Sequence, residues 1–221
     1  MTRVSSFTQE ENNVFDRILE SRRSIRAFEP EIPPKEEIVK VIRAGLLAPY
    51  PGLRVVGDVY FRRFVVIEKD SPQIAKVAEI ATRQVKSRAE QLKKELQANP
   101  LLQSQGQEFV KRLERLAKIG VPGIGTAPYY IVVAEQRGFP PVEQESLAHC
   151  LQNMWLKATA LGLGFHLVSA TAQMAQDKEF CSLLGIPYGE FGMNGCAIGY
   201  QKGALSPASH PAVNEVTKWI E

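Results

Sequence analysis

A short basic segment near the start of the chain has the residue types needed to bind a phosphate group. Residues 21–26 contain three arginines and two serines, where a helical pattern gives way to an extended one. Side chains of an extended chain alternate between two faces, so Arg22, Ser24 and Arg26 are expected to point the same way. Guanidinium groups hold phosphate oxygens through charge-assisted, bidentate hydrogen bonds. The segment indicates an anion site, but the same residues would also suit a solvated basic turn.

The rest of the sequence lacks the motifs of common catalytic sites. The three histidines, His149, His166 and His210, have no metal-binding spacing. No G-x-S-x-G motif occurs, and residues 120–125 fit neither a dinucleotide fingerprint nor a Walker A loop. Pairs of glutamates stand at helix starts, where the helix dipole accounts for them. We therefore predict no metal site and no catalytic side chain, and expect a cofactor to carry any chemistry.

The composition is that of an ordinary globular protein. The chain has 221 residues, of which 44% are apolar and 23% charged, so it can bury a sizeable core. The net charge of +3 does not by itself indicate a polyanionic partner. Residues 82–118 are locally basic, but glutamates are interleaved with the basic residues as on a solvated helix face. A nucleic-acid partner is therefore the least favoured interpretation.

The cysteines and the distribution of apolar residues indicate in which cellular compartment the protein is expected. Cys150, Cys181 and Cys196 are odd in number and lack metal-binding spacing, which favours a reducing compartment. The first eleven residues have no apolar segment typical of a secretory signal, and no stretch reads as a transmembrane helix. We predict a cytoplasmic protein with no membrane partner.

The apolar periodicity predicts one α+β domain over residues 1–221. Helices are expected at residues 8–21, 34–47, 72–98, 142–161 and 177–184, with another around residues 109–116. Strands are expected at residues 59–67, 129–134, 165–168 and 196–200. The buried stripe expected for helix 34–47 consists of Ile38, Val39, Val41, Ile42 and Leu46.

Four landmarks, taken in order along the chain, resemble the nitroreductase family of flavin-dependent oxidoreductases. Residues 22–28 are similar to the R-R-S-I-R-x-F phosphate segment of the family, and residues 44–51 to its helix ending in an A-P turn. The third landmark is the run 127–133 with the following helix that ends at residues 160–164. The fourth combines residues 184–187 with residues 197–200. The resemblance spans about residues 16–200, with an extended helical insert of low similarity at about residues 75–123.

The resemblance implies an α+β homodimer with a central, mostly antiparallel sheet flanked by helices and with swapped terminal segments. Two FMN molecules would lie at the dimer interface, each contacted by both chains. In the implied ping-pong reaction, NAD(P)H passes a hydride via flavin N5 to a small electron-poor acceptor such as a nitro compound or a quinone. The insert would cap the flavin cleft as a lid or extend the dimer interface.

The resemblance also assigns cofactor-binding residues. Those implied to hold the FMN phosphate and ribityl chain are Arg22, Arg23, Ser24 and Arg26. Those implied to come from the partner chain and pack near the flavin ring are Pro49, Tyr50 and Pro51. The turn implied to present backbone N–H groups to flavin N5 consists of Ser169, Ala170 and Thr171.

The sequence departs from the family pattern in two places. Residues 50–61 lack the Asn and the Gln-Pro-Trp that the family usually has there, and Tyr50 would narrow the face over the ring. Where the family has a C-terminal Arg or Lys for the phosphate, only Lys202 and His210 are at hand. Two alternatives stay open: a flavin-binding protein without turnover, such as a sensor or store, and an enzyme like the flavin destructases of the same superfamily.

Overall fold

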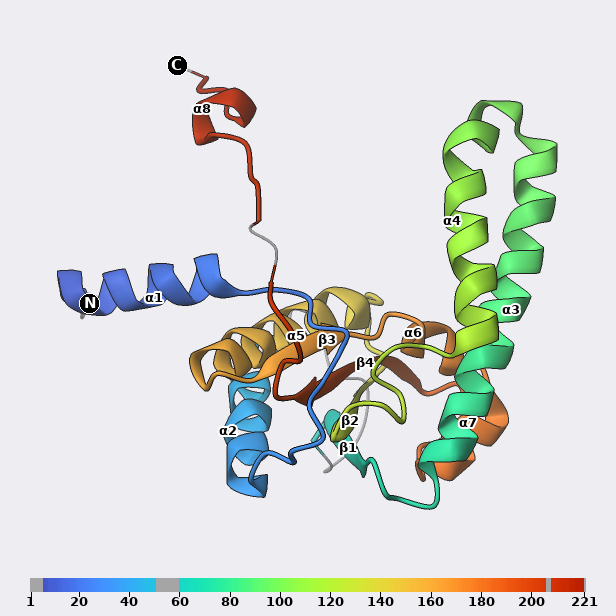
Figure 1. Ribbon diagram of the computed structural model, residues 1–221, viewed down its shortest axis with the longest axis horizontal. Helices are drawn as coiled ribbons and strands as arrows, with labels where there is room; N and C mark the ends of the chain where they lie inside the picture. Colours follow the sequence, from blue (N-terminus) through green and yellow to red (C-terminus); the bar gives the residue numbers. More distant parts are fainter. Residues whose placement is uncertain (1–5, 51–59, 206–207, 221) are drawn as a thin grey trace.

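A four-stranded antiparallel sheet forms the centre of the computed structural model, which describes residues 6–50, 60–205 and 208–220 (Figure 1). The strands lie side by side in the order β1-β2-β4-β3. Their bounds are Arg62–Glu68 for β1, Tyr129–Gln136 for β2, Gly164–Leu167 for β3 and Phe191–Gly199 for β4. Every neighbouring pair is antiparallel. The sheet and its helices confirm the predicted α+β fold.

Both faces of the sheet are buried, and β2 shows this directly. Tyr129, Ile131 and Val133 belong to the core under α2 (Lys35–Leu46) and α5 (Glu143–Ala160). Their neighbours Tyr130, Val132 and Ala134 belong to the second core, under α3 (Ile74–Ala98), α6 (Thr171–Met174) and α7 (Lys178–Leu183). Because strand side chains alternate between faces, a continuous apolar run lets one strand serve two cores.

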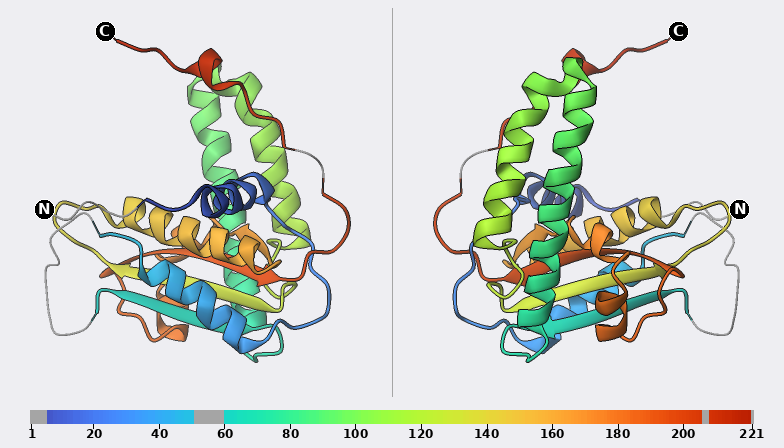
Figure 2. Two further views of the ribbon diagram at one scale, coloured as in Figure 1. Left: turned by 90° about the vertical axis from the view of Figure 1, so that its left-hand side faces the viewer. Right: turned by 90° about the vertical axis from the view of Figure 1, so that its right-hand side faces the viewer.

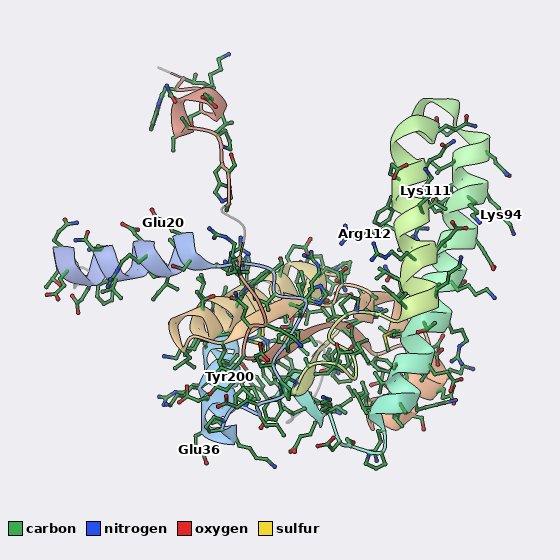
Figure 3. The ribbon with its side chains drawn as sticks, viewed as in Figure 1. Glu20, Glu36, Lys94, Lys111, Arg112 and Tyr200 are labelled. Carbon is green, nitrogen blue, oxygen red and sulfur yellow. The ribbon has the colours of Figure 1, made fainter. Side chains whose placement is uncertain are left out.

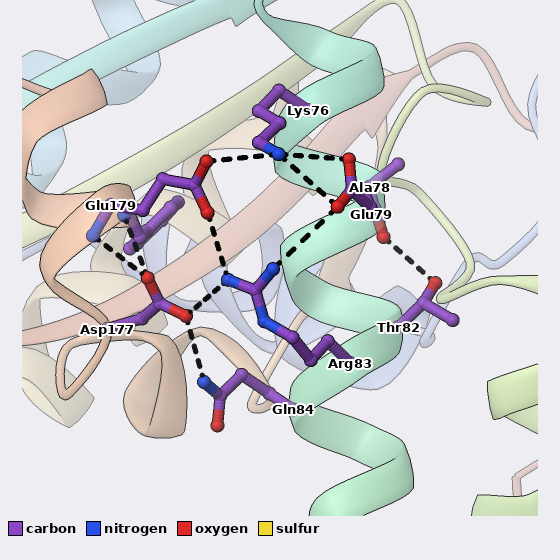
Figure 4. Close-up of polar contacts among 9 residues, drawn as sticks. Lys76, Ala78, Glu79, Thr82, Arg83, Gln84, Asp177 and Glu179 are labelled. Carbon is purple, nitrogen blue, oxygen red and sulfur yellow. Dashed lines mark hydrogen bonds and ion pairs between the residues drawn. The ribbon is translucent and has the colours of Figure 1, made fainter.

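A long helical hairpin rises from the second face of the sheet (Figure 2). It consists of α3 (Ile74–Ala98) and α4 (Pro100–Ile119), with Pro100 opening the second helix. Its base is tied to α7 (Lys178–Leu183) by the polar network of Figure 4, in which Arg83 Nη2 lies 2.7 Å from Asp177 Oδ2 and 3.1 Å from Glu179 Oε2. The insert is therefore fixed to the body at its lower end.

Both ends of the chain project from this body (Figure 1). Helix α1 (Gln9–Ser21) begins at a capping box between Thr8 and Glu11, as the spacing predicts. It buries no residue within this chain, and α8 (Val213–Val216) near the other end also buries none. Apolar side chains on both segments are left exposed: Phe7, Val14, Phe15, Leu19, Val213, Val216, Trp219 and Ile220.

Several sequence predictions need correction. In α2, Val39 is 62% exposed and Leu46 41% exposed, because only the side of the helix that carries Ile38 and Val41 meets α5 and the sheet. Strand β4 is much longer than the predicted 196–200, since its first residues pair with the end of β2. The short helix α6 (Thr171–Met174) was not predicted. The predicted start of the first strand, Val59, lies outside the described residues.

None of the helices that the structure describes is both long enough and apolar enough to cross a membrane.

Candidate functional site

A cavity of about 480 Å³ lies between the base of the helical hairpin and the carboxyl end of β3. Its walls come from α3 and α4, from the loop at Val121 and Pro122, and from the segment that leads from β3 into α6. Much of the lining is aliphatic, with Leu113, Leu116 and Val168 among its residues. The basic side chains on it are Arg26, Arg88, Arg112 and Arg115, and no described lining residue is acidic. The cavity therefore suits a flat, partly apolar ligand that carries negative charge.

The turn after β3 is held rigidly against the sheet. The Thr171 hydroxyl donates to the Val168 carbonyl at 2.7 Å and lies 2.7 Å from the Tyr130 hydroxyl, which can donate to it. Both side chains are buried. A Cβ on Gly195 would lie 2.6 Å from Thr171 Oγ1, so only glycine allows this approach. The buried hydroxyl pair positions the backbone of residues 168–171.

That turn presents two unused donors. The N–H of Thr171 donates to the Val168 carbonyl at 3.0 Å. In the described part of the chain, by contrast, the N–H groups of Ser169 and Ala170 donate to no group, and both residues line the cavity. Backbone donors of this kind normally find a partner, here water or a ligand. Of the three residues predicted to offer N–H groups, Ser169 and Ala170 are free to do so, and Thr171 holds the turn.

The basic segment divides into residues with different surroundings. The Arg22 guanidinium lies over the Trp155 ring, 4.4 Å from its centroid. Arg23 folds back onto the end of α1, where Nη1 donates to the carbonyls of Glu20 and Arg22. Neither arginine lines the cavity. Arg23 in this position satisfies helix-terminal carbonyls, the ordinary role of a basic residue at a helix end.

The second half of the segment runs along the sheet edge. Ser24 forms a parallel bridge with Phe165, and the Ile25 N–H donates to the Phe165 carbonyl at 2.9 Å. This pairing brings Arg26 to the cavity wall. Among the described residues Arg26 has no acidic partner, so its guanidinium is available to a ligand.

His166 on β3 was not predicted as a site residue. Its Nδ1 lies 3.1 Å from the Pro122 carbonyl, which can only accept a hydrogen bond, so Nδ1 carries the proton and Nε2 keeps its lone pair. Burial lowers the pKa of His166 to about 4, helped by the positive charges of Arg26 and Arg112. The cavity thus contains a neutral imidazole at pH 7.

This shifted pKa predicts a pH-dependent stability. Below pH 6.5 the unfolded chain protonates this histidine, while the folded protein resists until about pH 4. Protonation therefore favours unfolding, and the contribution of His166 is full above pH 6.5 and lost as the pH falls to about 4. In denaturant titrations the stability difference between wild type and His166→Gln should shrink over this range. His149→Gln, at an exposed position on α5, is the control, and equal pH profiles for wild type and His166→Gln would contradict the assignment.

Two of the residues predicted to reach a partner's flavin, Pro49 and Tyr50, lie outside the lining of this cavity. The Tyr50 hydroxyl donates to the Gln136 carbonyl at 3.4 Å, and its ring packs on Phe61 at 4.5 Å between centroids. Pro49 is exposed and its carbonyl accepts a hydrogen bond from Ser146. Pro51 lies outside the described residues. Within one chain Pro49 and Tyr50 do not line the cavity that Arg26 lines.

A buried ion pair holds the end of α2 from which Pro49 and Tyr50 extend. Arg62 Nε lies 2.5 Å from Glu135 Oε1, and both side chains are fully buried. The same guanidinium donates to the carbonyls of Gly45 and Ala48 and to the Ser146 hydroxyl. It therefore links β1, β2, α2 and α5 at one point.

The two basic residues predicted near the C-terminus are exposed. The Lys202 N–H donates to the Ala27 carbonyl at 3.0 Å, which places Lys202 beside the basic segment but outside the cavity lining. His210 lies in the projecting C-terminal segment and makes no hydrogen bond with the described residues. Neither residue lines the cavity that Arg26 lines.

Sequence reasoning missed Arg112 and Arg115, because the whole basic insert was interpreted as a solvated face. A signal was present in their spacing. Arg112, Arg115 and Ile119 are three and four residues apart, which puts them on one side of a helix together with Leu116.

The fold is of the α+β class, and its cavity sets basic side chains beside an aliphatic wall. The sequence model of the Nitroreductase family matches residues 19–200, and the chain belongs to this family. No curated protein matches the sequence significantly.

Solved structures share the fold at low sequence identity. A nitroreductase with bound FMN from Desulfitobacterium hafniense DCB-2 is 20% identical, with a TM-score of 0.67 over 95% of this chain and 99% of that one. A nitroreductase with bound FMN from Bacteroides fragilis NCTC 9343 is 18% identical, with a TM-score of 0.66 over 93% and 98%. An FMN- and NADPH-dependent nitroreductase from Sphigopyxis sp. strain HMH is 17% identical, with a TM-score of 0.64 over 93% and 98%.

Proposed function

We propose that this protein is an FMN-dependent oxidoreductase that passes a hydride from NAD(P)H to a small electron-poor acceptor. The observation that carries the proposal is the cavity in which Arg26 and the free N–H groups of Ser169 and Ala170 converge beside an apolar wall. Family membership and the FMN bound in the two relatives above support it. The acceptor class, a nitro compound or a quinone, follows from the family resemblance.

The donor set fits FMN. The cofactor has a flat ring system with polar edges and a phosphate tail, and it supplies the hydride-carrying chemistry when bound. The N–H groups of Ser169 and Ala170 would orient the ring edge and favour developing negative charge on it. Arg26, with Arg22 and Ser24 earlier in the same segment, would hold the ribityl phosphate portion. Thr171 and Tyr130 would keep the donor turn fixed while ligands exchange.

We also propose that the protein works as a homodimer with swapped ends in the cytoplasm. The support for the dimer is the apolar surface of α1 and of the C-terminal segment, which project from the body and on which Phe15 and Trp219 are exposed among the described residues. Exposed apolar patches of this kind mark protein–protein interfaces. In such a dimer Pro49, Tyr50 and Pro51 of one chain would face the flavin of the other, and Lys202 and His210 could reach its phosphate.

An absorption spectrum followed by an anaerobic titration tests the function. We expect protein incubated with FMN and then separated from unbound flavin to be yellow, and NADH or NADPH to bleach its visible absorption in the absence of oxygen. A protein that is colourless after this separation would overturn the proposal. Yellow protein that neither nucleotide bleaches would identify a flavin-binding protein without turnover.

A further inference from the structure

Helix α4 forms one wall of the cavity, and this wall carries positive charge that is not assigned to FMN in the proposed function. Arg112 and Arg115 line the cavity from α4, whereas Arg26 and the donor turn lie on the body of the protein. Figure 3 shows Arg112 on the inner side of α4, above the sheet layer, and Lys94 on the outer side of the hairpin. The positive groups therefore come from two separate parts of the fold.

Three other basic residues of the hairpin are paired with glutamates. Arg88 Nη1 lies 3.0 Å from Glu95 Oε1, Lys111 Nζ lies 2.6 Å from Glu108 Oε1, and Lys93 pairs with Glu114. Arg112 and Arg115 have no acidic partner among the described residues. Their charge is thus left available on the side of the helix that faces the cavity.

The groups around Arg112 and Arg115 disfavour a further positive charge in the cavity, so a bound ligand would have to supply the negative charge. His166 lines the same cavity, and its pKa is lowered by burial and by the charges of Arg26 and Arg112, so the imidazole is neutral at pH 7. Since no described lining residue is acidic, converging guanidinium groups repel one another until an anion enters. Beside them, Leu113, Leu116 and Ile119 offer an aliphatic surface for a ring.

We propose that the acceptor reduced by this protein carries a carboxylate, bound by Arg112 and Arg115 while its ring packs on the aliphatic wall. This inference rests on the proposed function, because it names the substrate class of that site. Guanidinium groups at helical spacing suit a carboxylate, which accepts paired hydrogen bonds from them. The helical insert would thus select the acceptor.

Two pairs of probes that differ by one charge test the inference. Benzoate and benzamide are titrated into FMN-loaded protein by calorimetry, and KM is measured for 4-nitrobenzoate and 4-nitrobenzamide. We expect wild type to have a lower Kd or KM for the carboxylate of each pair than for the amide. In the Arg112→Gln/Arg115→Gln variant, the ratio of the amide value to the carboxylate value should fall at least about tenfold. Lys111→Gln/Lys118→Gln removes the same charge from the same helix outside the cavity lining and should retain it.

The outcomes separate this inference from the function on which it rests. FMN affinity is measured first for all three proteins and should be similar. A loss of FMN affinity confined to Arg112→Gln/Arg115→Gln would assign these arginines to the cofactor phosphate and overturn the inference. If Arg112→Gln/Arg115→Gln instead raises the KM for NADPH and leaves the preference for the carboxylate probes unchanged, the two arginines bind NADPH. That result would also overturn the inference. Wild type that binds FMN and is bleached, but shows no preference for the carboxylates, would overturn the inference alone, whereas failure to bind FMN would overturn both.

Discussion

Replacing Arg62 with methionine is expected to lower the free energy of unfolding by about 3–5 kcal/mol, the cost typical of removing one partner from a buried ion pair. Glu135 would lose the guanidinium that lies 2.5 Å away in the wild type, in a fully buried site where burial already raises the pKa of its carboxyl group. The carbonyls of Gly45 and Ala48 would also lose their donor. Chemical denaturation of the purified variant measures the loss.

The neighbouring arginine on the same strand provides a matched control. Arg63 is half-buried, and its guanidinium lies over the Phe191 ring at 4.8 Å from the centroid. Arg63→Met removes the same chemical group but leaves no buried charge unpaired, so its cost should stay near 0.5–1 kcal/mol, roughly that of an exposed cation–π contact. Equal losses for the two variants would show that the Arg62 network contributes no special stability.

Replacing Arg26 with alanine is expected to weaken FMN binding by about 1.5–3 kcal/mol, the range for a lost hydrogen bond to a charged group. This corresponds to a roughly tenfold to hundredfold rise in Kd. The reason is that Arg26 lines the cavity and has no acidic partner among the described residues, so a ligand anion is the natural partner of its guanidinium. Quenching of flavin fluorescence on titration with FMN gives the Kd.

The control for Arg26 is a basic residue of similar exposure away from the cavity. Lys86 is an exposed residue of α3 outside the cavity lining, and Lys86→Ala should leave the Kd for FMN unchanged. If Arg26→Ala binds FMN as tightly as wild type does, Arg26 has no part in holding the cofactor. A parallel denaturation of Arg26→Ala checks that any loss of binding is not a loss of folding.

The elements that follow from neighbouring residues could be predicted from the sequence. The capping box at Thr8, the strand at β2 and the helix at α5 all depend on residues a few positions apart, and the structure has them. The R-R-S-I-R-x-F segment also led to the family, which the match over residues 19–200 confirms. Local patterns are reliable here because helix and strand periodicity is set within the element itself.

The tertiary structure alone decided how the site is assembled. Tyr130 reaches Thr171 across 41 residues, and Arg62 reaches Glu135 across 73, so no local pattern announces either contact. For Arg112, the spacing from Arg115 and Ile119 indicates a shared side of the helix, but only the packing brings that side to the cavity with Arg26 and His166. The exposure of Val39 in α2 could not be predicted either. Periodicity indicates which face of a helix is apolar, but not how much of that face the neighbouring elements cover. The physical reason is that burial and electrostatic environment depend on which distant surfaces pack together, whereas the sequence pattern records only what each element can offer to that packing.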